Sequence, residues 1–357
     1  MRTYHEDKFY SCAGRLYQLY NQNSRKSGFA ARSITEFEAW KLQTRNILSD
    51  ITGLSRMQPG SGRSCILESV QLDGYRRDKM ILETEPDVWM PFYVLVPDSI
   101  AEHKKLPVMI AAHGHCGGGK YAVAGRTDIP AVDEAIREMH YDYGHRFALE
   151  GYIVFCPDAR GFGERREAGL QGDEESHYMS SSCYSLNNQA ISLGLSLTGM
   201  WIWDLMRLID YIETRPDCNT EKIACCGLSG GGLQALWLAA MDDRIRLCIV
   251  SGYFYGYFDS LMKMPYNCSC NYVPHLWEHV DMGDLGALIA PRPLLIQSGM
   301  QDDLNGKRGV INAVEQVEIT ARAYKLFDAQ DRLYHQIFTG GHRWDGEKSY
   351  EFVKRWL

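Results

Sequence analysis

The chain has 357 residues, 45% of them hydrophobic, which is enough for one large α/β domain with an added segment. Its net charge of -7 gives no electrostatic support to nucleic-acid binding. Residues 1–27 lack the apolar run of a signal peptide, and no stretch of about 18 apolar residues predicts a membrane span.

The 11 cysteines are an odd number, and without a secretory signal we expect reduced thiols in a cytoplasmic protein. Cys268 and Cys270 form a C-x-C pair, which alone lacks the further ligands that a metal needs. A metal or a disulfide at this pair is the less favoured alternative. We therefore expect no bound metal and no cofactor.

The first predicted element is a helix over residues 33–54, where Ser33 and Glu36 have the spacing of a capping box. Its apolar residues recur with helical periodicity, so we expect it to pack on the domain that follows. The sequence divides into an N-terminal helical extension, residues 1–60, and a larger α/β domain, residues 61–357.

Strands follow over residues 65–97, with Asp73 and Gly74 as a turn, and short apolar strands then alternate with helices. The later strands are expected over residues 106–112, 152–157, 222–227, 246–251, 292–299 and 334–339. The helices are expected over residues 131–149, 198–215, 231–241, 310–326 and 346–357. This alternation predicts an α/β fold with a mostly parallel central sheet and helices on both faces.

A G-x-S-x-G pattern over Gly227–Gly231 lies between a predicted strand and a predicted helix. A sharp turn of this kind lifts a serine hydroxyl toward a base that takes its proton, so Ser229 is the candidate nucleophile. The pattern alone also fits a glycine-rich turn that ends a strand. The interpretation therefore depends on the partners of the serine.

The partners follow in the order nucleophile, acid, histidine, which is the order of the α/β-hydrolase fold. Asp302 comes after the strand over 292–299, and His342 lies near the C-terminus. Asp303 is adjacent, and whether it or Asp302 is the acid is left open. If neither of these aspartates is the acid of the triad, Asp259 is the next candidate.

The loop after the strand over 106–112 is the expected place of an oxyanion hole, which we assign to the backbone amides of His115 and Gly230. A rival interpretation makes His113, His115 and Cys116 metal ligands. We disfavour it because no second Cys or His pair has a finger-like spacing, and because alternate residues at a strand end point apart.

An aromatic insertion at about residues 253–285 is expected to roof the pocket. Tyr253, Tyr255 and Trp344 are the candidate substrate-binding residues. A small separate hydrophobic cluster, buried under a loop and without a role in binding, explains the aromatic residues equally well.

Two groups of charged residues are expected to be structural. Arg160 is predicted to brace the floor of the site by pairing with nearby acids such as Asp158 or Glu164, and orienting a carboxylate of the substrate is the less favoured alternative. An intrahelical ion-pair ladder is predicted for Asp204, Arg207 and Asp210.

Several segments together resemble bacterial α/β-hydrolases grouped with acetyl xylan esterases and dienelactone hydrolases. The resemblance spans residues 66–357 and rests on 113–115, 158–164, 203–210, the serine turn and 341–344. It implies an esterase, often one that deacetylates sugars, with Ser229, Asp302 and His342 as its triad. The chain has Phe162 where the R-G-Q motif of acetyl xylan esterases has glutamine, and Ser229 where dienelactone hydrolases have cysteine.

The sequence thus predicts a serine carboxylesterase that cleaves short-chain acyl esters, acetyl esters first, through an acyl-enzyme. The expected substrate is a small-molecule or carbohydrate ester. We expect the protein to bind neither nucleic acid nor a membrane, and whether it forms a homo-oligomer is left open. One alternative is a peptidase of the prolyl-oligopeptidase type, although the chain has no room for a propeller domain. The other is a noncatalytic hydrolase-fold interaction protein, which would predict a broken triad.

Overall fold

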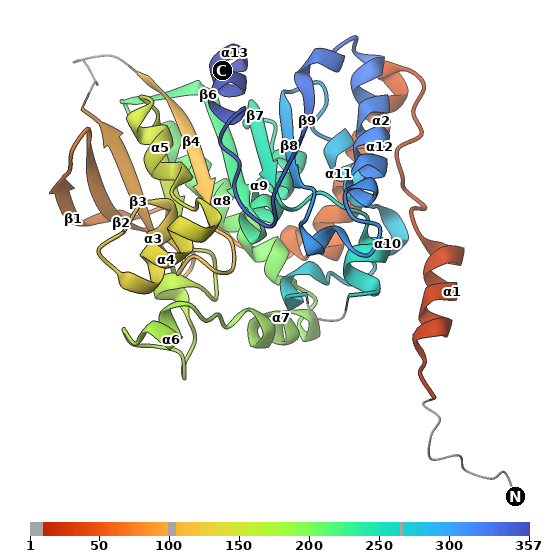
Figure 1. The fold of residues 1–357 in the computed structure, drawn as a ribbon, viewed down its shortest axis with the longest axis horizontal. Helices are drawn as coiled ribbons and strands as arrows, with labels where there is room; N and C mark the ends of the chain where they lie inside the picture. The colour runs from red at the N-terminus through yellow and green to blue at the C-terminus, as the bar shows by residue number, and fades with distance from the viewer. Residues whose placement is uncertain (1–9, 99–104, 265–266) are drawn as a thin grey trace, which may run out of the picture.

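The computed structural model describes residues 10–98, 105–264 and 267–357. Within these ranges, nine strands form one sheet in the order β1-β2-β3-β5-β4-β6-β7-β8-β9. The first three strands, β1 (Ser64–Gln71), β2 (Tyr75–Glu85) and β3 (Val88–Pro97), run antiparallel at the left of Figure 1. Gly74 has a φ of 86° in the turn between β1 and β2, a conformation that favours glycine.

The remaining six strands run parallel to one another, as predicted. They are β4 (Leu106–Ala112), β5 (Ile153–Pro157), β6 (Cys218–Leu228), β7 (Leu247–Ser251), β8 (Leu294–Gly299) and β9 (Leu333–Phe338). Figure 1 shows β4 running from top to bottom, with α6 (Glu175–Tyr178) and α7 (Cys183–Ser192) below its end. These helices therefore lie at the carboxyl ends of the parallel strands, where ligands bind in open α/β sheets.

Both faces of the sheet are buried, because successive side chains along a strand point to opposite sides. Val108 and Ile110 of β4 belong to one apolar core, together with residues of α8 (Leu197–Thr214) and α9 (Gly230–Met241). Met109 and Ala111 belong to the other, with residues of α5 (Tyr143–Leu149) and α13 (Ser349–Trp356). The predicted helices on both faces are confirmed.

The single helix predicted over 131–149 is wrong. The chain forms α4 (Pro130–Met139) and α5, and His140 between them has a φ of 54°. A residue in the left-handed region ends a right-handed helix, because the backbone after it no longer follows the helical path.

The shorter helices are α3 (Lys120–Val123), α10 (Leu276–His279) and α11 (Met282–Ala287). The helix α12 (Val310–Leu326) has the predicted bounds.

The N-terminal part contains α1 (Ala13–Asn23) and α2 (Ile34–Ile51). Ser33 caps α2 by accepting a hydrogen bond from the Glu36 amide at 3.2 Å, while the Glu36 carboxylate accepts from the Arg32 amide instead of that of Ser33. Phe37 of α2 packs edge-on against Phe327, with ring centroids 4.8 Å apart. The helix therefore packs on the rest of the chain, as predicted.

The segment around α1 contacts the aromatic insertion. Tyr20 lies against Phe258 with ring centroids 5.0 Å apart, and Arg25 pairs with Asp284 at 2.8 Å. Across the described ranges, no helix combines the length and apolarity that a membrane crossing requires.

Candidate active site

Ser229 occupies a strained turn between β6 and α9. Its φ of 60° and ψ of -122° are rare for a residue with a side chain, and such strain is typical of nucleophile turns. A Cβ at Gly227 would lie 2.2 Å from the carbonyl carbon of Gly231, so the turn has no room for one. The glycines of the G-x-S-x-G pattern are therefore required by close backbone approach.

His342 contacts one of the two adjacent aspartates. Its Nδ1 donates to Oδ2 of Asp302 at 2.8 Å, and Oδ1 of Asp302 accepts from the Leu304 amide at 2.9 Å. Asp302 is buried, whereas Asp303 is exposed. Asp259, the third candidate, instead pairs with Lys263 at 2.8 Å and with Arg308. The geometry thus favours Asp302 as the partner of His342.

A cavity of about 570 Å³ brings most of the predicted site residues together. It is lined by Ser229, Gly230, Asp302, His342, His115, Tyr253 and Tyr255, together with Cys116, Ser181, Asn267, Cys268, Asn271, Gln301, Asp303 and Leu304. Ser229 and His342 share this cavity without a hydrogen bond between their side chains within the described structure. Contacts of this kind often tighten only when substrate is bound.

The two predicted oxyanion donors lie beside each other. Gly230 is the first residue of α9, so its amide has no acceptor within the helix. A Cβ at Gly230 would lie 2.6 Å from Nδ1 of His115, which places the loop after β4 directly against the serine turn. The role of the His115 and Gly230 amides stays a prediction.

His113 does not join His115 and Cys116 in a metal site. It is buried, its Nδ1 donates to the Gly114 carbonyl at 2.8 Å, and its Nε2 accepts from the Ala159 amide at 3.0 Å. Burial lowers the pKa of His113 and so favours its neutral form. The side chain of His115 instead approaches the thiol of Cys270, with Nε2 3.3 Å from Sγ.

The expectation that Trp344 binds substrate is not supported. Its side chain is 1% exposed and stacks on Tyr143, with ring centroids 4.5 Å apart. The indole therefore serves as core under α5 and is absent from the cavity wall. Tyr253 and Tyr255 do line the cavity, and the Tyr253 hydroxyl donates to Oδ1 of Asn271 at 2.7 Å.

The charged residues brace the site with partners other than those predicted. Arg160 pairs with Asp204 at 2.8 Å and with Glu85 at 2.7 Å. Asp204 therefore pairs with Arg160 at the floor of the site and does not join an intrahelical ladder. Of the three predicted residues, Arg207 and Asp210 form the intrahelical pair.

The acids expected to pair with Arg160 bind a lysine that the sequence analysis did not single out. The fully buried ammonium of Lys120 lies 2.5 Å from Asp158 and 2.5 Å from Glu164. No local spacing relates Lys120 to these two residues, since they come from separate loops at the carboxyl ends of β4 and β5.

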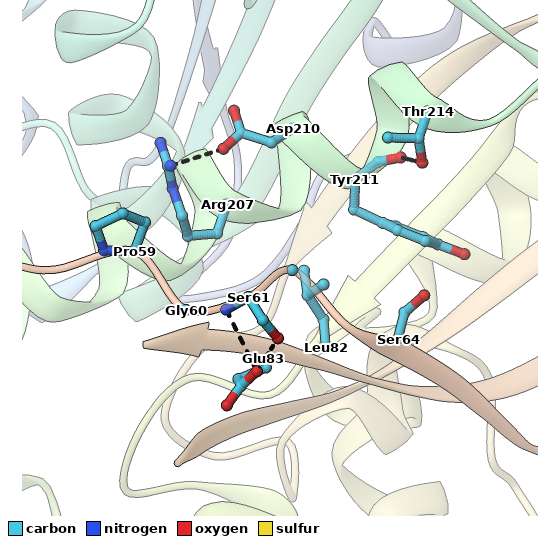
Figure 2. A pocket seen from close by; sticks show the side chains of 11 residues that line it. Pro59, Gly60, Ser61, Ser64, Leu82, Glu83, Arg207, Asp210, Tyr211 and Thr214 are labelled. Atoms are coloured by element: carbon cyan, nitrogen blue, oxygen red, sulfur yellow. Dashed lines mark hydrogen bonds and ion pairs between the residues drawn. The ribbon is translucent and has the colours of Figure 1, made fainter. Parts of the chain in front are cut away.

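A second cavity, of about 310 Å³, lies between α8 and the segment that leads into β1 (Figure 2). Figure 2 shows Arg207 paired with Asp210, and Ser61 donating to Glu83. This cavity contains none of the predicted site residues. Its charged side chains are paired, so we assign the chemistry to the cavity around Ser229.

The family model described as the Abhydrolase family matches residues 2–341 of the chain. "Putative hydrolase YtaP" of Bacillus subtilis (strain 168) is 30% identical over 206 residues, which are 57% of this chain and 63% of that protein. Carbohydrate esterase MZ0003, from an unknown prokaryotic organism, is 27% identical over 163 residues, 40% of this chain and 33% of that protein. The matched segments span less than two thirds of either relative.

Two solved structures are similar over nearly the whole chain. A protein of Bacteroides fragilis NCTC 9343, described as a putative acetyl xylan esterase, has a TM-score of 0.74 at 20% identity, covering 95% of this chain and 84% of that one. A glucuronoyl esterase from Solibacter usitatus has a TM-score of 0.68 at 16% identity, covering 93% of this chain and 96% of that one. At these identities the likeness establishes the α/β-hydrolase fold.

Proposed function

This chain belongs to the Abhydrolase family, and from that membership we propose that it is a serine carboxylic ester hydrolase that acts on carbohydrate esters. The observation that carries the proposal is the His342–Asp302 hydrogen bond of 2.8 Å in the cavity that also holds Ser229. A serine on a strained turn beside an aspartate-bound histidine is the arrangement of acyl-transfer enzymes.

In the proposed mechanism, His342 takes the proton of Ser229 as Oγ attacks the ester carbonyl. The Gly230 and His115 amides stabilise the oxyanion, and the alcohol leaves with a proton from His342. Water then hydrolyses the acyl-enzyme by the same steps. Asp302 holds the His342 ring in the required tautomer and stabilises the imidazolium.

The proposed substrate is an acetyl ester of a sugar. Relatives and structural neighbours named as carbohydrate esterases support the sugar. Tyr253 and Tyr255 line the cavity, but the two residues are 4% and 1% exposed, so the choice of a sugar rests on these relatives and neighbours. We also propose a cytoplasmic location, because all 11 cysteines are unpaired.

A substrate panel tests this proposal. It compares an acetylated xylo-oligosaccharide, a glucuronic acid methyl ester, p-nitrophenyl acetate and a peptide p-nitroanilide. The highest kcat/KM is expected for the acetylated sugar. A preference for the uronic acid ester would retain the esterase and replace the acetyl specificity. Cleavage of the peptide amide alone would contradict the proposal.

A further inference from the structure

Four metal-binding side chains converge beside the proposed active site. A ring nitrogen of His115 and the Sγ atoms of Cys183, Cys268 and Cys270 all lie within 4.8 Å of one another. Sγ of Cys183 lies 2.8 Å from that of Cys268, and Nε2 of His115 lies 3.3 Å from Sγ of Cys270. A tetrahedral zinc ion, with Zn–S bonds of about 2.3 Å and Zn–N bonds of about 2.0 Å, holds its ligand atoms roughly 3.5–3.8 Å apart. The two separations of 2.8 and 3.3 Å are shorter than that value, and no pair of the four ligand atoms is more than 4.8 Å apart, so small shifts of the side chains would bring them to zinc geometry.

The four residues come from three parts of the chain. His115 lies in the loop after β4, Cys183 is the first residue of α7, and Cys268 and Cys270 flank Ser269 in the insertion. The C-x-C pair thus gains its missing ligands only in the folded chain. From this convergence we propose that His115, Cys183, Cys268 and Cys270 bind one zinc ion.

Ordinary core packing explains this arrangement less well. Free thiols pack as small apolar groups, and Cys225 and Cys226 do so within β6. In the cluster, by contrast, an imidazole nitrogen is directed at a buried thiol, and two sulfur atoms lie nearer each other than unbonded thiols normally do. A cation that takes the thiol protons' place gives all four donors one common partner, because each donor then points at the metal.

The backbone around the C-x-C pair is held in shape by other residues. Thr198 donates to the Cys270 carbonyl at 2.5 Å, and Asn271 donates to the Cys268 carbonyl at 3.0 Å. Asn187 of α7 donates to the Ser269 carbonyl at 2.6 Å, which ties α7 to this turn. Supporting hydrogen bonds of this kind orient ligands before a metal arrives.

The donor set selects the metal and its role. Three thiolates and one imidazole suit zinc, whereas magnesium and calcium require oxygen ligands. Because four protein ligands fill a tetrahedral shell, the site is structural and has no open position for a water nucleophile. On binding, Zn²⁺ displaces the thiol protons to solvent, and the zinc replaces three S–H bonds with three Zn–S bonds.

A zinc ion here would join α7 and the insertion to the loop that carries the predicted oxyanion amide. With Nε2 on the metal, Nδ1 of His115 keeps its proton and the ring stays against Gly230. The inference goes beyond the proposed function, since it rests on the cluster and not on ester hydrolysis.

The test is the metal content of the full chain, produced without a polyhistidine tag, purified without chelator and measured by inductively coupled plasma mass spectrometry. We expect about one zinc per chain, and below about a tenth of that in Cys183→Ser and Cys270→Ser. Cys116→Ser is the matched control, because this exposed thiol adjoins His115 outside the cluster, and its zinc content should equal that of the wild type. Ser229→Ala should keep zinc while losing activity, which separates this inference from the proposed function.

Because a ligand variant that fails to fold would also lack zinc, the wild-type protein supplies a second measurement. Replacement of zinc by Co²⁺ should give the visible bands of tetrahedral cobalt and the near-ultraviolet absorption of cobalt–thiolate bonds. The inference is overturned if the wild type binds neither metal, if the cobalt spectrum lacks thiolate absorption, or if the control loses as much zinc as Cys183→Ser. A Cys183–Cys268 disulfide in metal-free protein, found by peptide mass spectrometry, would also overturn it.

Discussion

The imidazole of His342 donates to the carboxylate of Asp302 at 2.8 Å, while the neighbouring Asp303 projects as an exposed side chain. The pair comes from two loops that follow β8 and β9, adjacent parallel strands of the sheet. Two residues 40 positions apart are thus joined because parallel strands end at the same edge.

Replacement of Asp302 by asparagine is expected to lower kcat by about 10⁴-fold, because an amide no longer holds the His342 tautomer. Asp303→Asn, the matched control, should stay within about twofold of the wild type. Steady-state kinetics with p-nitrophenyl acetate, with folding followed by circular dichroism, measures both. The reverse ranking would transfer the role to Asp303.

Ser229→Ala and His342→Ala are each expected to cost roughly 10⁴-fold or more in kcat, and the double variant should be no slower than either. The losses do not add because the two side chains act as one chemical unit. The same kinetic assay applied to all three variants checks this. If the two losses multiplied in the double variant, the residues would act independently and the proposed relay would be wrong.

The length of the acyl chain provides a third prediction. We expect kcat/KM to fall from acetyl to butyryl to octanoyl p-nitrophenyl esters. Each methylene that fitted the cavity would add about 0.8 kcal/mol of apolar burial, so a decline must come from steric exclusion. A steady rise toward octanoyl would indicate an open acyl groove and remove the deacetylase proposal.

Asp204→Asn is expected to destabilise the fold by about 3–5 kcal/mol, because it removes the buried counter-charge of Arg165 and one of the two carboxylates that pair with Arg160. The carboxylate accepts from these guanidinium groups at 2.8 and 2.7 Å. Asp210→Asn, with the Asp210 side chain 42% exposed, should cost less than about 1 kcal/mol. Urea denaturation of both variants measures the difference, and equal losses would contradict the bracing role of Asp204.

The same residue predicts a pH dependence. Burial alone would raise the pKa of Asp204, but the charges of Arg160 and Arg165 outweigh it and hold the pKa well below its usual value. The carboxylate therefore adds stability above the unfolded-state pKa of about 3.9, and this stability is lost as the pH falls through the folded pKa. Denaturation curves of wild type and Asp204→Asn should converge in acid, and a constant difference at all pH values would contradict the assignment.

The sequence predicted the parts of the structure that depend on local patterns. The strand β4 and the helix α12 have the expected bounds because apolar periodicity and flanking turns define them. The serine turn follows from glycines at fixed spacing. The division of residues 131–149 into two helices escaped prediction, because nothing in the composition around His140 requires a left-handed residue.

Contacts between segments that are distant in the sequence could not be predicted from sequence patterns. Trp344 was expected to bind substrate, but the chain turns its indole into the core against Tyr143. Cys183 lies 85 positions before Cys268, so no spacing motif relates the two. Lys120 likewise meets Asp158 only through the arrangement of strands β4 and β5.

Covalent labelling tests the central claim, that Ser229 is an activated nucleophile. The folded protein is treated with a fluorophosphonate, which phosphonylates serines activated by a neighbouring base with loss of fluoride, and the modified peptide is identified by mass spectrometry. We predict one phosphonyl group on Ser229, no label on Ser229→Ala, and at least about 10²-fold slower labelling of His342→Ala, because the base no longer takes the serine proton. Labelling of the wild type at another residue, or equal labelling of Ser229→Ala, would contradict the account.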